Sequence, residues 1–212
     1  MAFKLLLDVD GVLVRNQELH QKVDDNVARY VAKKLPHSKQ PALVARMLYR
    51  KYGHTAIGLQ RAFGVDSRDF DDFVYDRKLI DSLWEHISGT EFQQEAEIIS
   101  SLSDWVPTIL FSNSPHQWTI PVASAISDTV RIARPFHLKP CRQAYRAFPT
   151  SSEYLFVDDR IDNLKAADRF DNWHPVLFSD RKSRFPTVGS IWELGLMVNS
   201  ALLDGNLKSF LV

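Results

Sequence analysis

Four aspartates follow two short apolar runs of the chain. Asp8 and Asp10 come directly after one run, and Asp158 and Asp159 come after another. Either pair alone is typical of a turn, because aspartate and glycine favour turns. If the two runs lie side by side in a sheet, however, four carboxylates meet at one edge and repel one another unless a cation lies among them. Oxygen ligands without histidine or thiolate partners favour Mg²⁺ over zinc.

A hydroxyl, an amide and a lysine complete this set of polar residues. Ser112 and Asn113 follow a third apolar run, and Lys139 lies between that run and Asp158. A metal ion and an ammonium group offset negative charge on a transferring phosphoryl group, and a serine hydroxyl donates to its oxygens. The sequence therefore predicts a magnesium-dependent site for a phosphoryl group.

The elements that must position these residues are buried strands alternating with helices. Short apolar runs predict strands of a parallel sheet covered on both faces, which is an α/β, doubly wound, Rossmann-like core. Ligands of such sheets bind at the carboxyl ends of the strands, where the polar residues lie. The expected strands are residues 3–7, 107–111, 129–132, 153–157 and 175–178, and the expected helices between them are residues 118–125, 141–148 and 161–170.

A helical segment separates the first strand from the rest of the core. Between residues 16 and 89 the apolar residues recur at helical spacing, and no strand-like alternation interrupts them. Pro41 is expected to begin one of these helices and Gly53 to end it. We therefore expect a core domain of residues 1–15 and 90–212, with an all-helical insertion of residues 16–89.

The composition is that of an ordinary globular protein. Of 212 residues, 45% are hydrophobic and 25% are charged, and the formal net charge is zero, which gives no reason to expect a nucleic acid polymer or a membrane as partner. The single cysteine, Cys141, cannot form an intrachain disulfide, so we expect a cytoplasmic protein. We expect a monomer or a homodimer, and the apolar tail of residues 191–212 could complete the core or form an interface.

Taken together, these residues resemble the haloacid dehalogenase (HAD) superfamily of phosphohydrolases. Four short motifs occur in the order typical of that family, and they span essentially the whole chain. The matching residues are Asp8-Val9-Asp10-Gly11-Val12, Leu110-Phe111-Ser112-Asn113, Leu138-Lys139-Pro140, and Phe156-Val157-Asp158-Asp159 with Asn163 beyond it.

The resemblance implies a mechanism that uses Mg²⁺ and two aspartates. Asp8 would attack phosphorus and form an aspartyl-phosphate, and Asp10 would protonate the leaving oxygen and later take a proton from water. Asp8, the backbone carbonyl of Asp10, and Asp159 would ligate Mg²⁺, with Asp158 ligating it or lying next to the ligands.

The remaining motif residues are expected to hold the substrate and shape the site. Ser112 and Lys139 would bind the phosphoryl oxygens, and Asn113 would contribute to substrate binding. Gly11 and Asn163 would orient the surrounding loops and ligands.

The insertion resembles the helical cap of one branch of this superfamily. Such a cap closes over the site and selects the leaving group. The segments 52–59, 63–66 and 73–76 are similar to the cap of pyrimidine 5′-nucleotidase-like members, and Tyr52, His54 and Arg61 are candidates for gripping a nucleoside 5′-monophosphate. One departure is that this group usually has Asn-Thr-Leu after its second aspartate, whereas this chain has Gly11-Val12-Leu13, which is common among sugar-phosphate phosphatases and phosphomutases.

Three alternatives to a nucleotidase follow from the same residues. The first is a sugar-phosphate phosphatase or phosphomutase of the same superfamily, and the second is a non-catalytic binding protein that retains the fold. The third is a protein phosphatase, which the insertion disfavours because a cap would obstruct a bulky substrate. A dehalogenase is also disfavoured, because that reaction needs no Mg²⁺ and would not require Asp10 together with Asp158 and Asp159.

Overall fold

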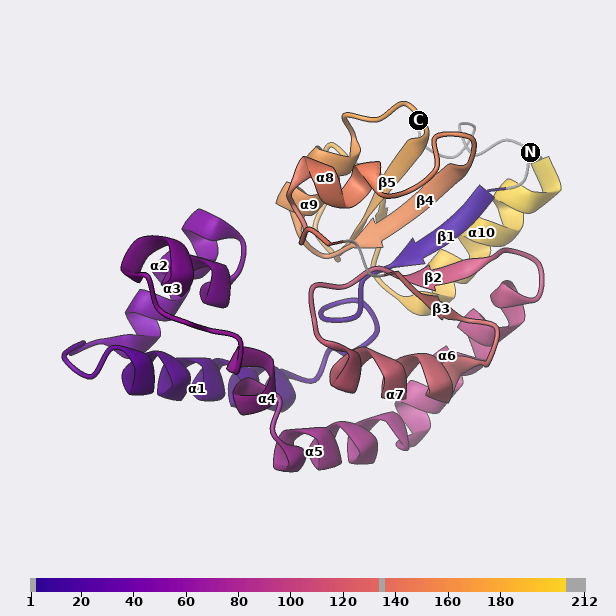
Figure 1. Cartoon of the computed structure of the whole chain (residues 1–212). Coiled ribbons are helices and arrows are strands. Elements are labelled where there is room, and N and C mark those ends of the chain that lie inside the picture. Colours follow the sequence, from indigo (N-terminus) through magenta and orange to yellow (C-terminus); the bar gives the residue numbers. More distant parts are fainter. Residues whose placement is uncertain (1–2, 134–135, 205–212) are drawn as a thin grey trace. The chain divides into compact units, whose positions relative to one another are not determined.

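The core of the protein is a parallel six-stranded sheet. The computed structural model describes residues 3–133 and 136–204, so the ends of the expected core domain, residues 1–2 and 205–212, lie outside the described residues. The strand order is β3-β2-β1-β4-β5-β6, and every pairing is parallel (Figure 1). The strands are β1 (Phe3–Leu7), β2 (Thr108–Leu110), β3 (Arg131–Ile132), β4 (Glu153–Asp158), β5 (Trp173–Phe178) and β6 (Thr187–Val188). The predicted α/β fold class is confirmed.

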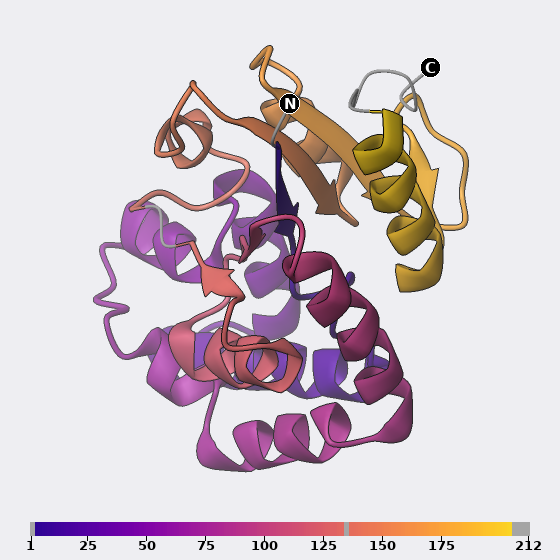
Figure 2. The ribbon, with the colours of Figure 1, turned by 90° about the vertical axis from the view of Figure 1, so that its right-hand side faces the viewer.

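Helices cover both faces of this sheet. Helices α8 (Arg142–Arg146) and α9 (Ile161–Ala167) lie on one face, whereas α6 (Thr90–Ser103), α7 (His116–Ile126) and α10 (Ile191–Asp204) lie on the other (Figures 1 and 2). β1 lies in the middle of the sheet between β2 and β4. Since parallel strands end at the same edge, the residues that follow β1, β2 and β4 are brought together there.

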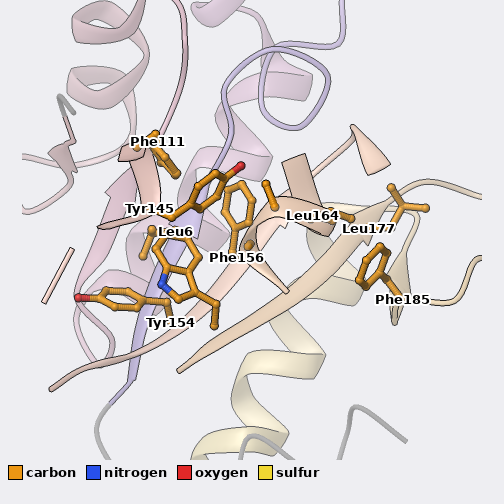
Figure 3. Packing of buried hydrophobic residues seen from close by; sticks show 12 residues of the cluster. Leu6, Phe111, Tyr145, Tyr154, Phe156, Leu164, Leu177 and Phe185 are labelled. Atoms are coloured by element: carbon orange, nitrogen blue, oxygen red, sulfur yellow. The ribbon is translucent and has the colours of Figure 1, made fainter. Parts of the chain in front are cut away.

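An aromatic cluster fills the space between the sheet and helices α8 and α9. Figure 3 shows its side chains, among them Phe111, Tyr145 and Phe156, each almost completely buried. The rings of Tyr145 and Trp173 meet edge to face with their centroids 5.1 Å apart, a favourable geometry for aromatic pairs. Because β4 contributes Tyr154 and Phe156 to this cluster, the strand that carries Asp158 is anchored in the buried aromatic core.

Several elements differ from the sequence prediction. The helix expected at residues 141–148 is shorter, and β5 begins two residues before the expected start. Helix α6 is not among the elements expected from the sequence, although Phe92, Ala96, Ile99 and Leu102 are buried on one side of it. Strand β6 is not among them either, and its two residues are too few to show a pattern. Within the tail, α10 buries Ile191, Leu194, Val198 and Ala201, so this part of the tail completes the core.

The chain divides into two compact units, residues 1–15 with 87–212 and residues 16–86. The second boundary was placed at residue 89 from the sequence, whereas the structure divides the chain at the end of α5 (Arg77–Ile87). The second unit, called the insertion below, contains the helices α1 (Gln17–Lys34), α2 (Pro41–Tyr52), α3 (Thr55–Phe63) and α4 (Phe70–Val74), together with most of α5.

The insertion has its own hydrophobic core. Tyr30 of α1 is fully buried, and its ring meets those of Phe70 and Phe73 at centroid distances of 5.0 and 5.3 Å. The Asn16 side chain caps α1 by accepting a hydrogen bond from the Leu19 amide. These features are those of an independently packed helical unit. No helix among the described residues is long and apolar enough to cross a membrane.

Candidate active site

Asp8 is the first residue after β1, and the sheet fixes its position. Its amide donates to the Val157 carbonyl at 2.9 Å, which continues the β1–β4 pairing one residue beyond Leu7. Its carboxylate accepts from the Val9 amide at 2.8 Å through Oδ1, while Oδ2 lies 3.0 Å from the Lys139 ammonium. The predicted nucleophile is therefore a nearly buried carboxylate held at the carboxyl edge of the sheet.

The turn after Asp8 requires a glycine. Gly11 has a φ of 84°, a left-handed conformation that other residues rarely adopt, and its amide donates to the Val14 carbonyl at 2.9 Å. A Cβ at this position would lie 2.3 Å from Oδ2 of Asp159. Gly11 thus allows the first loop and the Asp159 carboxylate to approach each other.

Asp158 is completely buried, and both of its oxygens accept hydrogen bonds. Lys139 Nζ lies 2.6 Å from Oδ2, and the Arg160 amide donates to Oδ1 at 2.9 Å. The side-chain Nδ2 of Asn163 donates to both oxygens at 2.9 Å. These contacts fix the Asp158 carboxyl group beside Lys139, and Asn163 is one of the residues that orient it.

Three of the predicted metal ligands lie together. One carboxylate oxygen from each of Asp8, Asp158 and Asp159 lies within 4.8 Å of the others. With Lys139 as the cation in contact, this group carries a formal charge of about minus two when all three carboxylates are ionised. Hard oxygen donors with this charge fit a divalent cation such as Mg²⁺.

The pKa values at this edge indicate a shortage of positive charge. Burial raises the pKa of Asp8 well above its usual range, and the charges of Asp158, Asp10 and Asp159 raise it further, against the opposing effect of Lys139. Burial, followed by the charge of Asp158, raises the pKa of Asp159 to about 6. A bound divalent cation would reverse both shifts, because it favours the ionised carboxylates.

Lys139 is buried between two carboxylates and two aromatic rings. Its Nζ lies 5.1 Å from the centroid of Phe111 and 5.3 Å from that of Phe156. Burial alone would lower the pKa of this ammonium, but the charges of Asp158 and Asp8 outweigh it and the pKa is raised. The lysine therefore stays protonated, as a group that binds phosphoryl oxygens must.

Asn113 contacts the backbone of Lys139 through both ends of its amide. Its Nδ2 donates to the Lys139 carbonyl at 2.9 Å, and its Oδ1 accepts from the Lys139 amide at 2.8 Å. Through these contacts Asn113 holds the loop that carries Lys139 against the sheet edge. Its substrate-binding role stays a prediction.

Ser112 follows the extension of β2, where the Phe111 amide donates to the Leu7 carbonyl at 2.8 Å. The Ser112 hydroxyl oxygen accepts from the Ser114 amide at 3.1 Å. That contact uses the oxygen as an acceptor, so the hydroxyl hydrogen can be donated to a phosphoryl oxygen, as the sequence prediction requires.

Two residues near Asp10 were not identified from the sequence. The Trp118 indole donates from Nε1 to Oδ1 of Asp10 at 2.9 Å, and the Ser114 hydroxyl donates to Oδ2. Trp118 was expected only as a member of a helix. The one sequence signal is indirect: a buried tryptophan needs an acceptor for its N–H.

The three candidates in the insertion are not gathered into a comparable cluster. Tyr52 packs against the insertion's own hydrophobic core, and the ring of His54 lies 5.2 Å from that of Phe70. Arg61 lies in the last turn of α3 and is exposed. Packing within the insertion accounts for the burial of Tyr52 and His54, and substrate binding by all three residues stays a prediction.

Solved structures with this fold were found, although no protein-family model and no curated protein matches the sequence. A HAD phosphatase from Thermococcus onnurineus aligns over 96% of this chain and 99% of its own, with 15% identity and a TM-score of 0.58. The chain has the haloacid dehalogenase fold. An L-2-haloacid dehalogenase from Xanthobacter autotrophicus, with chloropropionic acid covalently bound, covers 94% of this chain and 99% of its own, with 11% identity and a TM-score of 0.51. At these identities the similarity establishes the fold, which phosphatases and dehalogenases share, and the chemistry must be argued from the residues.

Proposed function

We propose that this protein is a magnesium-dependent phosphomonoester hydrolase that acts through an aspartyl-phosphate on Asp8. The observation that carries the proposal is the group formed by Asp8, Asp158, Asp159 and Lys139 at the carboxyl edge of the sheet. Its uncompensated negative charge and oxygen donors suit Mg²⁺, whereas a dehalogenase reaction would have no use for that charge. The cluster therefore favours the phosphohydrolase chemistry over the dehalogenase chemistry.

Each residue has a defined part in the proposed reaction. An Asp8 oxygen bonds to phosphorus as the bond from phosphorus to the ester oxygen breaks, and Asp10 gives its proton to that oxygen. Water then attacks the aspartyl-phosphate and gives a proton to Asp10, which releases phosphate and restores Asp8. Lys139 and Ser112 hold the phosphoryl oxygens through both steps.

Magnesium would be held by Asp8, the Asp10 carbonyl and Asp159, beside Asp158, and would neutralise charge on the phosphoryl group. The raised pKa of Asp8 adds a reason for this requirement. A carboxylate attacks phosphorus only when it is ionised, and Lys139 alone does not offset the burial and the neighbouring carboxylates. We therefore expect no turnover without a divalent cation.

For the substrate, we propose a small phosphorylated metabolite, with a pyrimidine nucleoside 5′-monophosphate as the first candidate. The support is the similarity of segments 52–59, 63–66 and 73–76 to nucleotidase caps, and we propose that the insertion acts as such a cap. Gly11-Val12 supports the second candidate, a sugar phosphate. Both candidates share the chemistry at Asp8 and differ only in the leaving group.

The test is phosphate release from a panel of esters with and without Mg²⁺. The panel contains pyrimidine and purine nucleoside monophosphates, sugar phosphates and an aryl phosphate. Asp8→Asn should abolish release, while Asp162→Asn is the matched control because its carboxylate is exposed in the first turn of α9. Fastest release from UMP or CMP would support the nucleotidase, and fastest release from sugar phosphates would replace it. Phosphate release by Asp8→Asn, or release at the same rate with and without Mg²⁺, would refute the mechanism.

A further inference from the structure

The side chain of Asp10 is held at both oxygens by residues from a distant part of the chain. Trp118, in the first turn of α7, donates to Oδ1 at 2.9 Å, and the Ser114 hydroxyl donates to Oδ2. Trp118 is fully buried, so its indole cannot turn to water. Both contacts lie inside the core unit, and neither depends on the insertion.

The backbone of Asp10 does not need these two contacts. The Val14 amide donates to the Val9 carbonyl at 2.8 Å, and the Gly11 amide donates to the Val14 carbonyl at 2.9 Å. These bonds close the loop on both sides of Asp10. What Trp118 and Ser114 add is therefore a fixed direction for the Asp10 carboxyl group.

The two donors differ in a way that suits an acid and base. An indole N–H can only donate, so Trp118 holds Oδ1 as an acceptor at every stage. A hydroxyl can rotate and can both donate and accept, so Ser114 can keep its contact with Oδ2 before and after the proton transfer. In the proposed reaction the proton passes from the Asp10 carboxyl group to the ester oxygen as the bond from phosphorus to that oxygen breaks and the Asp8–phosphorus bond forms.

We propose that Trp118 and Ser114 are positioning residues that aim the Asp10 carboxyl group at the leaving-group oxygen. This inference rests on the proposed function, in which Asp10 protonates the leaving-group oxygen. The competing explanation is structural: a buried indole N–H requires an acceptor, and Asp10 supplies it. The two explanations differ in how a loss of activity depends on the leaving group.

The test is to measure kcat/KM of Trp118→Phe and Ser114→Ala on esters with different leaving groups. An alkyl phosphate needs its leaving oxygen protonated, whereas a nitrophenyl phosphate needs this far less. On the alkyl ester we expect each variant to lose roughly 10- to 100-fold, the effect of removing one hydrogen bond to a charged group. The loss on the nitrophenyl ester should be several-fold smaller.

Two comparison variants sharpen this measurement. Ser114→Thr keeps the hydroxyl and should recover most of the activity on the alkyl ester. Trp105→Phe changes a tryptophan that is 78% exposed and should behave as the unchanged protein on both esters. An equal loss on the two esters would overturn the inference, because a general structural defect does not distinguish leaving groups. If Trp118→Phe does not fold, the Ser114 pair gives the same decision.

A crystal structure of the double variant Trp118→Phe/Ser114→Ala separates this inference from the proposed function. Rotation of the Asp10 carboxyl group away from its present direction is the expected result. An unchanged direction would overturn the inference, whatever the activity. If the unchanged protein hydrolyses no ester, the proposed function fails, yet a rotated Asp10 would still support positioning by Trp118 and Ser114.

Discussion

The sheet edge and the insertion differ in whether their charged side chains are buried or exposed. At the sheet edge Asp8, Lys139 and Asp158 are at most 6% exposed and contact one another. Among the described residues of the insertion, the buried polar side chains are the neutral Asn26 and Thr55. Its ion pairs, such as Asp66 with Arg68, lie at the surface.

This difference shows which part of the chain buries charged groups at a cost in stability. Burying a carboxylate is unfavourable even when it is paired, and apolar side chains of similar size would often stabilise a protein more. The insertion follows that pattern, because its core is aromatic and aliphatic. The sheet edge does not, and perturbed carboxylates gathered at the end of a sheet are typical of functional sites.

The largest expected effect comes from removing the buried ammonium group. Lys139→Met would leave Asp8 and Asp158 without their cation, which should lower the free energy of unfolding by about 3–5 kcal/mol. The matched change in the insertion is Lys34→Met, which removes an ion pair with Asp69 at 2.8 Å. That pair is partly exposed, so its loss should cost at most about 1 kcal/mol.

Urea denaturation of both variants in metal-free buffer measures this contrast. Added Mg²⁺ should recover part of the stability of Lys139→Met, because a cation at the carboxylates offsets the same charge, and it should not affect Lys34→Met. Equal costs for the two lysines would show that the sheet edge is no different from the insertion.

The second effect compares two glycines in the left-handed conformation. Gly64 ends α3 with a φ of 66°, and apart from its chain neighbours no described residue has an atom within 4 Å of the position its Cβ would take. Gly64→Ala should therefore cost only the backbone strain, about 1–2 kcal/mol. Gly11→Ala carries a similar strain and also places a methyl group 2.3 Å from Asp159 Oδ2.

Displacing Asp159 should weaken Mg²⁺ binding about 10- to 100-fold, the usual size of effects on residues that orient a metal ligand. Calorimetric titration with Mg²⁺ tests this, with Gly64→Ala as the control that keeps the affinity of the unchanged protein. Unaltered Mg²⁺ affinity in Gly11→Ala would exclude Asp159 as a ligand of the metal.

The fold could be predicted from the sequence where a strand or helix has a clear local pattern of apolar residues. The run of residues 3–7 is entirely apolar except for Lys4 and ends at an aspartate, so β1 was found with its observed bounds. The buried residues of α6 do recur at helical spacing, so this helix could have been predicted from the sequence beyond residue 89. The two-residue strand β6 depends on pairing with β5, which no local pattern records, whereas the two residues of β3 lie within the strand expected at residues 129–132.

The site could be predicted from the sequence only where the order of strands and helices brings the residues together. Aspartates after β1 and β4 must meet, because parallel strands end at a common edge. The partners of these residues could not be foreseen in the same way. Trp118 reaches Asp10 across 108 positions of the sequence, and Asn113 reaches Lys139 across 26. Side-chain direction decided both contacts, and that direction depends on tertiary packing.

The third expected effect is a pH dependence located in the insertion, and it is confined to acidic pH. Burial lowers the pKa of His54 to about 4, and its buried Nδ1 has no hydrogen-bond partner in the part of the chain that the structure describes. Above pH 6.5 His54 is neutral in both the folded and the unfolded chain, so it causes no pH dependence there. As the pH falls from 6.5 towards 4, the unfolded chain binds a proton that the folded insertion does not. The free energy of unfolding therefore decreases, by about 2 kcal/mol at pH 5 for such a shift.

His54→Gln isolates this contribution, because glutamine does not titrate and every other group is common to both proteins. Amide hydrogen exchange in α1 to α3 at pH 7 and pH 5 reports the local free energy of opening. The decrease between these pH values should be about 2 kcal/mol smaller in His54→Gln than in the unchanged protein. An equal decrease in both would mean that His54 is protonated in the folded insertion. The insertion would then contain a buried charge of its own, and the contrast with the sheet edge would no longer hold.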